Sequence, residues 1–172
     1  ADEKDVSPEG GNGSVIITGG SNEARGARSV IIAGKHNVTK ASGDIIIGGM
    51  DNVADKQRAM VLNGDYNYAS GYEAVVIGGE SNDSTGTHSL TVGGYSNAAT
   101  AKNAVAVGGR NNTATALGAV VMGGASNDSI GTRSLVAGGN DNTASGDEAL
   151  ALGGEKNLSS GPKAVTIAGY GN

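Results

Sequence analysis

The sequence contains no cysteine, phenylalanine or tryptophan, and it has only five tyrosines and two histidines. Without cysteine, neither a disulfide framework nor a cysteine-based zinc site is possible. This absence fits a protein of a reducing cell, and it fits equally a surface protein that crosses membranes unfolded. The apolar runs are only about four residues long, so the sequence predicts no membrane span.

The formal net charge of -5 disfavours a nucleic-acid partner, which would require a basic stripe. His36 and His88 lie far apart, and no nucleophile or carboxylate constellation recurs around either. The paired glycines are not phosphate loops, because no helix follows them, and the scattered acids form no calcium-binding ladder. We therefore expect no enzyme activity, no cofactor and no metal site.

A unit of fifteen residues begins at Ser14 and repeats without insertion or deletion through ten full copies and part of an eleventh. We number its positions from one at Ser14. Position six is glycine and position nine is asparagine in every copy, from Gly19 and Asn22 onward. Such a strict period indicates that successive copies stack as coils of a solenoid. Residues 1–13 are predicted to be a loosely ordered leader and residues 14–172 to form the repeat domain.

The pattern within the unit predicts two strands and two turns per coil. Positions two to four are apolar almost throughout, as in Val15, Ile16 and Ile17, and predict a short strand. Glycine at position six permits positive φ and predicts a turn. Position eleven holds only Ala, Ser or Thr between variable neighbours, which predicts a second strand with one buried face. Glycine or alanine at position thirteen suits the second turn.

These elements predict an all-β parallel roll, a rod of roughly 48 Å at the usual spacing between strands. The stacked asparagines are predicted to bond to the coils on either side and to adopt the left-handed backbone of tight turns.

Position three of the first strand carries no charged residue in any copy. If positions two and four fill the interior against position eleven, position three points outward and forms a long apolar stripe. Such a stripe predicts a partner, and the simplest partner is another copy of the chain. The predicted interface residues are Ile16, Ile31, Ile46, Val61, Val76, Val121 and Val136. The reverse assignment would leave positions two and four outward, a face that is more apolar still.

The repeat, as in residues 74–82 with Ser84 and Gly86 following, resembles the head repeat of the trimeric autotransporter adhesins, the YadA-like bacterial surface proteins. The resemblance covers residues 14–172. It implies a left-handed parallel β-roll, a homotrimer, and projection from the outer membrane on a coiled-coil stalk. Family members bind host receptors or matrix proteins such as collagen, fibronectin and laminin. Collagen-binding members display Asn-Ser-Val-Ala-Ile-Gly motifs, and no segment here matches one in full.

The expected function is therefore that of an adhesin head on the bacterial cell surface, acting in cell adhesion and virulence. The chain ends nine residues into a copy without a stalk or barrel, so we expect a fragment whose only membrane attachment is an anchor missing from its C-terminal side. One alternative is a structural spacer or trimeric shield without its own ligand. A third is ice binding, which would need a flat, regular threonine face, whereas threonine is scattered here over six positions.

A binding site on a regular rod is expected where the regularity breaks. Position ten is predicted to be exposed, and it holds Val38, Val53 and Tyr68 in successive coils, with Glu23 and Asp83 at the ends of this column. Exposed apolar and tyrosine side chains bounded by charge are typical of protein-binding hot spots. The predicted contact residues are Val38, Val53, Tyr66, Tyr68 and Tyr72. Packing of these residues under a loop or a trimer edge is the alternative.

Overall fold

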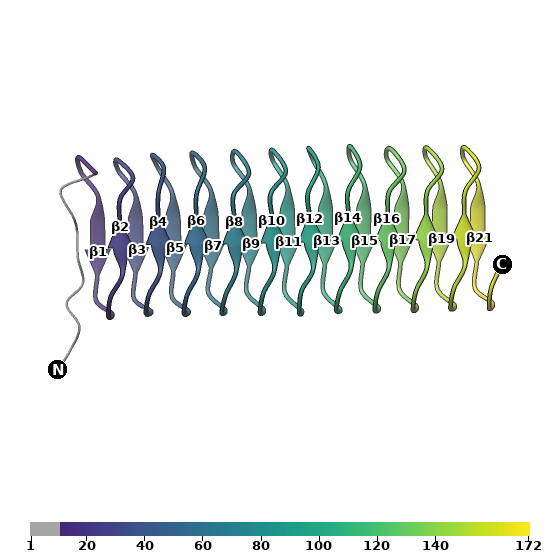
Figure 1. Ribbon diagram of the computed structural model, residues 1–172, viewed down its shortest axis with the longest axis horizontal. Helices are drawn as coiled ribbons and strands as arrows, with labels where there is room; N and C mark the ends of the chain where they lie inside the picture. Colours follow the sequence, from purple (N-terminus) through teal and green to yellow (C-terminus); the bar gives the residue numbers. More distant parts are fainter. Residues whose placement is uncertain (1–10) are drawn as a thin grey trace.

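The computed structural model describes residues 11–172, and these residues form a parallel β-solenoid that contains no helix. The coils lie side by side along one long axis, and the chain ends at the far end of the rod from where the described residues begin (Figure 1). The predicted all-β roll of fifteen-residue coils is confirmed. Residues 1–10 of the predicted leader lie outside the described residues.

Two sheets make up the solenoid. The eleven-stranded sheet contains β1 (Val15–Ile17), β3 (Val30–Ile32), β5 (Ile45–Ile47), β7 (Met60–Leu62), β9 (Val75–Ile77), β11 (Leu90–Val92), β13 (Val105–Val107), β15 (Val120–Met122), β17 (Leu135–Ala137), β19 (Leu150–Leu152) and β21 (Val165–Ile167). The ten-stranded sheet contains β2 (Glu23–Ala24), β4 (Val38–Thr39), β6 (Val53–Ala54), β8 (Tyr68–Ala69), β10 (Asp83–Ser84), β12 (Ala98–Ala99), β14 (Thr113–Ala114), β16 (Asp128–Ser129), β18 (Thr143–Ala144) and β20 (Leu158–Ser159).

Every strand pairs in parallel with the strand fifteen residues further along, so equivalent positions stack in columns; Ile16 pairs with Ile31, for example. Position seven adds a third ladder of single-residue parallel bridges, which runs from Gly20 to Tyr170. The sequence predicted two strands per coil but not this third ladder. This ladder hydrogen-bonds the turn between the two strands of each coil to the same turn in the next coil, so equivalent turn residues stack as regularly as the strand residues do.

The predicted orientation of the first strand is wrong. Position three points into the roll: Ile31, Ile46, Val61, Val76, Val121 and Val136 are fully buried, and Ile16 in the first coil packs against this core. Positions two and four point outward and are half-buried or exposed. The physical reason is volume. The facing positions one and eleven carry small residues such as Ala59 and Ala54, which leave room for one branched side chain per coil and not for two.

Several polar side chains interrupt the core and bond within it, whereas the buried hydroxyl of Ser159 has no hydrogen-bond partner among the described residues. The hydroxyls of Ser84 and Ser89 lie 2.7 Å apart, and Thr91 donates to the carbonyl oxygen of Asp83 at 2.7 Å. Asp44 is the one ionisable residue in the core of the described chain. Its carboxylate accepts hydrogen bonds from the backbone of Ala41 and Ala59, yet burial raises its pKa to about 6. Because this pKa is raised, the free energy of unfolding is expected to depend on pH.

Glycine at position six is required by both conformation and space. Gly34 has φ of 87°, and a Cβ atom there would lie 2.3 Å from the carbonyl oxygen of Gly49 in the next coil. Its predicted role in the first turn is confirmed. In the second turn the left-handed residue stands at position fifteen, as in Arg28 and Arg58. Glycine at position thirteen instead allows close approach, since a Cβ on Gly26 would lie 1.8 Å from the carbonyl oxygen of Ala41.

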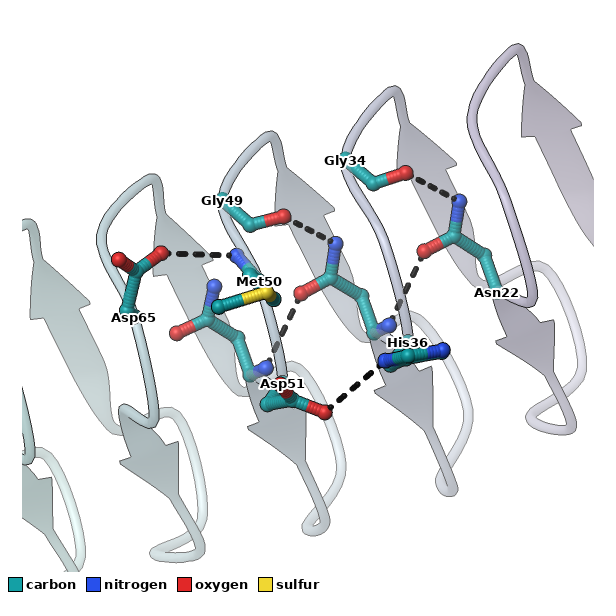
Figure 2. A network of polar contacts seen from close by, with 9 residues as sticks. Asn22, Gly34, His36, Gly49, Met50, Asp51 and Asp65 are labelled. Carbon is teal, nitrogen blue, oxygen red and sulfur yellow. Dashed lines mark hydrogen bonds and ion pairs between the residues drawn. The ribbon is translucent and has the colours of Figure 1, made fainter.

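The asparagines of position nine bond to the backbone of the next coil. The side-chain nitrogen of Asn22 donates to the carbonyl oxygen of Gly34, and its oxygen accepts from the backbone nitrogen of Asn37, both at 3.0 Å (Figure 2). This pattern continues to Asn172, so the predicted ladder is present. The side chains bond forward to the next coil, whereas the sequence predicted bonds to the coils on both sides. The left-handed backbone falls one residue earlier than predicted, at position eight, for example at His36 and Asp51.

Candidate binding surface

Position ten lies on the outer face of the ten-stranded sheet and carries the centre of the predicted contact site. Val38 pairs with Val53, and Val53 pairs with Tyr68, so the three form one column across β4, β6 and β8. All three side chains are half-buried. We call these three residues the contact column. Glu23 and Asp83 continue the column at its two ends. The predicted arrangement of these residues is therefore present, while their role in binding stays a prediction.

Tyr68 is held in place by two neighbouring polar side chains. Its hydroxyl donates to Oδ2 of Asp55 at 2.8 Å, and Nζ of Lys40 lies 3.6 Å from the same oxygen. Lys40 also lies over the tyrosine ring, with Nζ 5.9 Å from its centroid. The hydrogen bond to Asp55 is the main reason that the pKa of Tyr68 is raised, so the phenol is neutral at physiological pH. A preoriented aromatic ring suits binding, because little side-chain entropy is then lost on association.

The other two predicted tyrosines lie on the turns that flank β8. Tyr66 is on the preceding turn and is 55% exposed, while Tyr72 is on the following turn and is 38% exposed. The structure therefore brings Val38, Val53 and Tyr68 into one column and places Tyr66 and Tyr72 on separate parts of the coil.

Tyr72 belongs to a cluster of charged and aromatic groups. Nη1 of Arg58 lies 3.1 Å from the hydroxyl oxygen of Tyr72 and also donates to Glu73. Nε2 of His88 lies 3.3 Å from the second oxygen of Glu73, and the rings of Tyr72 and His88 meet edge to face at 6.0 Å. The hydrogen bond from Arg58 lowers the pKa of Glu73. The cluster is a set of mutually satisfied charges on an exposed turn.

The outer side of the eleven-stranded sheet is a second candidate surface. Positions two and four of the eleven copies supply 22 side chains, and every one is apolar. Ile47, Ile77 and Met122 on this face are 42%, 39% and 44% exposed. We call these side chains the apolar face. Sequence reasoning placed the interface stripe on position three, although one signal favoured positions two and four: position three includes Thr91 and Thr166, whereas two and four contain no polar residue.

Both histidines lie beside carboxylates of an adjacent coil. Nδ1 of His36 lies 3.4 Å from a carboxylate oxygen of Asp51 in the next coil (Figure 2). Residues 11–172 contain no group of three or more histidine or carboxylate side chains placed to hold a metal ion. Within that same range no helix has the length and apolarity to cross a membrane.

Comparison with models of known protein families gives no match for this chain, and comparison with curated proteins gives none either. The likeness to the trimeric autotransporter heads therefore rests on the repeat itself. What the structure establishes is a parallel β-solenoid with a wholly apolar outer face on one sheet and a mixed outer face on the other.

Proposed function

We propose that this chain is the head of a trimeric bacterial surface adhesin. In this proposal three parallel rolls, with the left-handed coil that the resemblance implies, meet through their apolar faces. The ten-stranded sheet of each roll then binds a host receptor or a matrix protein. The apolar face is the observation that carries the proposal. On an isolated chain it would leave an apolar strip along the whole rod in contact with water, far beyond the scattered exposure usual for soluble proteins.

The two sheets suit different roles in such an assembly. When identical chains associate around an axis, the face toward the axis is buried and the opposite face is displayed. The apolar face belongs to the eleven-stranded sheet, and the contact column belongs to the ten-stranded sheet on the other side of the roll. Burial of the apolar face in a trimer would therefore leave the contact column accessible. The contact column supplies the apolar and aromatic anchors that protein interfaces favour, next to the paired charges of Lys40 and Asp55.

An adhesion assay tests the function. Beads coated with the protein are applied to cultured host cells and to immobilised matrix proteins, and bound beads are counted. Replacing Val53 and Tyr68 together with serine removes the centre of the contact column, and we expect the affinity to fall more than tenfold, since hot-spot truncations typically cost about 2 kcal/mol each. The fold should be unaffected, because position ten also holds Asp128 and Thr143.

The control is Asp128→Ser combined with Thr143→Ser, at the same position of β16 and β18, and it should bind like the parent. Equal binding by the Val53 and Tyr68 double variant would show that the contact column is not the binding site. If the parent protein itself binds neither cells nor matrix proteins, the adhesive function is wrong, and a spacer or shield without its own ligand takes its place.

A further inference from the structure

Charges of opposite sign occupy different sides of this rod. Eleven lysines and arginines lie among the described residues, and eight of them are at positions twelve to fifteen, the turn that follows the ten-stranded sheet: Arg25, Arg28, Lys40, Lys56, Arg58, Lys102, Arg133 and Lys163. The same turn holds only four acids, Asp55, Glu73, Asp147 and Glu148. Positions seven to ten show the opposite balance, with three cations and eight acids. An overall acidic chain therefore carries a basic strip along one turn.

Stacking of the coils aligns these cations along the rod: five lie in the first three coils, and the sixth, eighth and tenth coils each add one. Equivalent positions follow one another at about 4.8 Å, so the strip from Arg28 to Lys163 extends over roughly 43 Å. The arginine stems are supported by glycine in the preceding coil: a Cβ on Gly43 would lie 3.5 Å from Cγ of Arg58, and a Cβ on Gly118 would lie 3.5 Å from Cγ of Arg133. The absence of side chains at these glycines lets the stems lie against the backbone, with the guanidinium groups at the surface.

Within residues 11–172, some of these cations have carboxylate partners and others do not. Arg58 pairs with Glu73 and Arg133 with Glu148, because a glutamate follows each arginine at position fifteen of the next coil. Arg28 is followed there by Gly43 and so lacks this partner. Across residues 11–172, no carboxylate lies within ion-pair distance of Arg28, Lys56 or Lys102, and all three residues are exposed. Unpaired exposed cations are the groups that an anionic ligand can neutralise without breaking an existing pair.

We propose that this strip, which we call the basic turn, binds a linear sulfated polysaccharide lying along the rod. A narrow row of cations, densest in the first three coils, matches a flexible polymer that carries anionic groups along its length, and the arginine fork suits oxyanions. A nucleic-acid duplex fits less well. It is wide enough to reach the neighbouring column at position ten, where Glu23, Asp83 and Asp128 would repel its phosphates. The inference concerns a single chain and does not depend on the adhesin proposal.

Binding to immobilised heparin over a range of salt concentrations tests the proposal. The variant Arg28→Gln, Lys56→Gln, Lys102→Gln removes from the basic turn the three cations that have no carboxylate partner among residues 11–172. We expect its Kd to rise about tenfold at low salt, as three exposed ion contacts are lost. The slope of log K against log salt should become shallower by roughly two units, because fewer counterions are released.

The matched control is Lys35→Gln, Arg110→Gln, Lys156→Gln, which removes three exposed cations from the opposite side of the rod and changes the net charge equally. Its Kd should stay within about twofold of the parent value, as expected for surface residues outside the contact. An equal loss in both triple variants would overturn the proposal, because binding would then follow net charge alone.

Two further probes decide the class of ligand. Chemically desulfated heparin should bind much more weakly than heparin, and duplex DNA of similar length should also bind more weakly. Equal binding of the desulfated polymer, tighter binding of DNA, or no binding of heparin at low salt would each contradict the proposal. Circular dichroism checks that all variants keep the β-solenoid.

Discussion

Replacing Asn82 with leucine should break one rung of the asparagine ladder in the middle of the rod. The side-chain oxygen of Asn82 accepts from the backbone nitrogen of Asn97 at 3.0 Å. Its side-chain nitrogen donates to the carbonyl oxygens of Gly78 and Gly94, both at 3.2 Å. Asn82 and Asn97 are fully buried, so water cannot replace these bonds. Leucine supplies neither an acceptor nor a donor.

The size of the effect follows from which groups lose their partner. The backbone N–H of Asn97 is left buried without an acceptor, which costs about 1–3 kcal/mol. Gly94 keeps a second donor, the backbone nitrogen of Glu80 at 2.9 Å, so its oxygen loses only part of its bonding. With the lost amide contacts included, we expect the free energy of unfolding to fall by about 3 kcal/mol. For a chain of this length, that corresponds to a melting temperature lower by roughly 9 °C.

Asn172→Leu provides the matched control. Asn172 is the last asparagine of the ladder, and its side-chain nitrogen donates only to the exposed carbonyl oxygen of Ala168. Loss of that bond should lower the free energy of unfolding by less than about 1 kcal/mol, because water can take its place. Urea unfolding monitored by circular dichroism, at one protein concentration and with m-values compared, measures both variants. An equal loss in the two variants, or none in Asn82→Leu, would refute the ladder as a source of stability.

Two other predictions concern the two faces of the first strand and the buried carboxyl group of Asp44. Replacing Ile47 and Ile77 together with aspartate should split a trimer into folded monomers in sedimentation experiments, and a monomeric parent protein would contradict the trimer. Ile46→Asp should instead unfold the roll, because the side chain of Ile46 is fully buried. Asp44 has a pKa raised from 3.8 to about 6, so its contribution to stability is complete below its ordinary pKa and is lost as the pH rises through 6. Asp44→Ser should remove up to about 3 kcal/mol of this pH dependence in unfolding experiments, and an unchanged pH profile would count against it.

The features predicted correctly from the sequence are those for which every coil requires the same residue type at the same position. Gly34 has no room for a side chain, and Asn37 bonds to the following coil, so both residue types recur in every copy and set the period. The orientation of the first strand could not be read in this way. Three consecutive apolar residues, such as Ile45, Ile46 and Ile47, show no alternation, and the volume available opposite them decides which one is buried.

The basic turn was not predicted from the sequence either, because the net charge sums over all positions of the repeat and does not show where in the repeat the cations lie. Arg58 and Asp65 stand seven residues apart in the chain, yet they lie on opposite turns of the roll. A net charge of -5 argued against a basic stripe, while the fold gathers most of the cations on one turn. Charge patterning in a solenoid is informative only once it is sorted by position in the repeat.

The stability of this rod and its surface chemistry rest on different columns. Gly34, Asn37 and Ile46 belong to columns whose partners are in adjacent coils, so a change at any of them disturbs the stacking. Position ten holds side chains as different as Tyr68 and Asp83, and position fifteen holds both Arg58 and Glu73, although the backbone conformation is the same in each coil. Substitutions in these outer columns should therefore alter recognition with little change in unfolding free energy, and interior substitutions should do the reverse. This separation makes the contact column and the basic turn testable by mutation, because a loss of binding is expected there without a loss of fold.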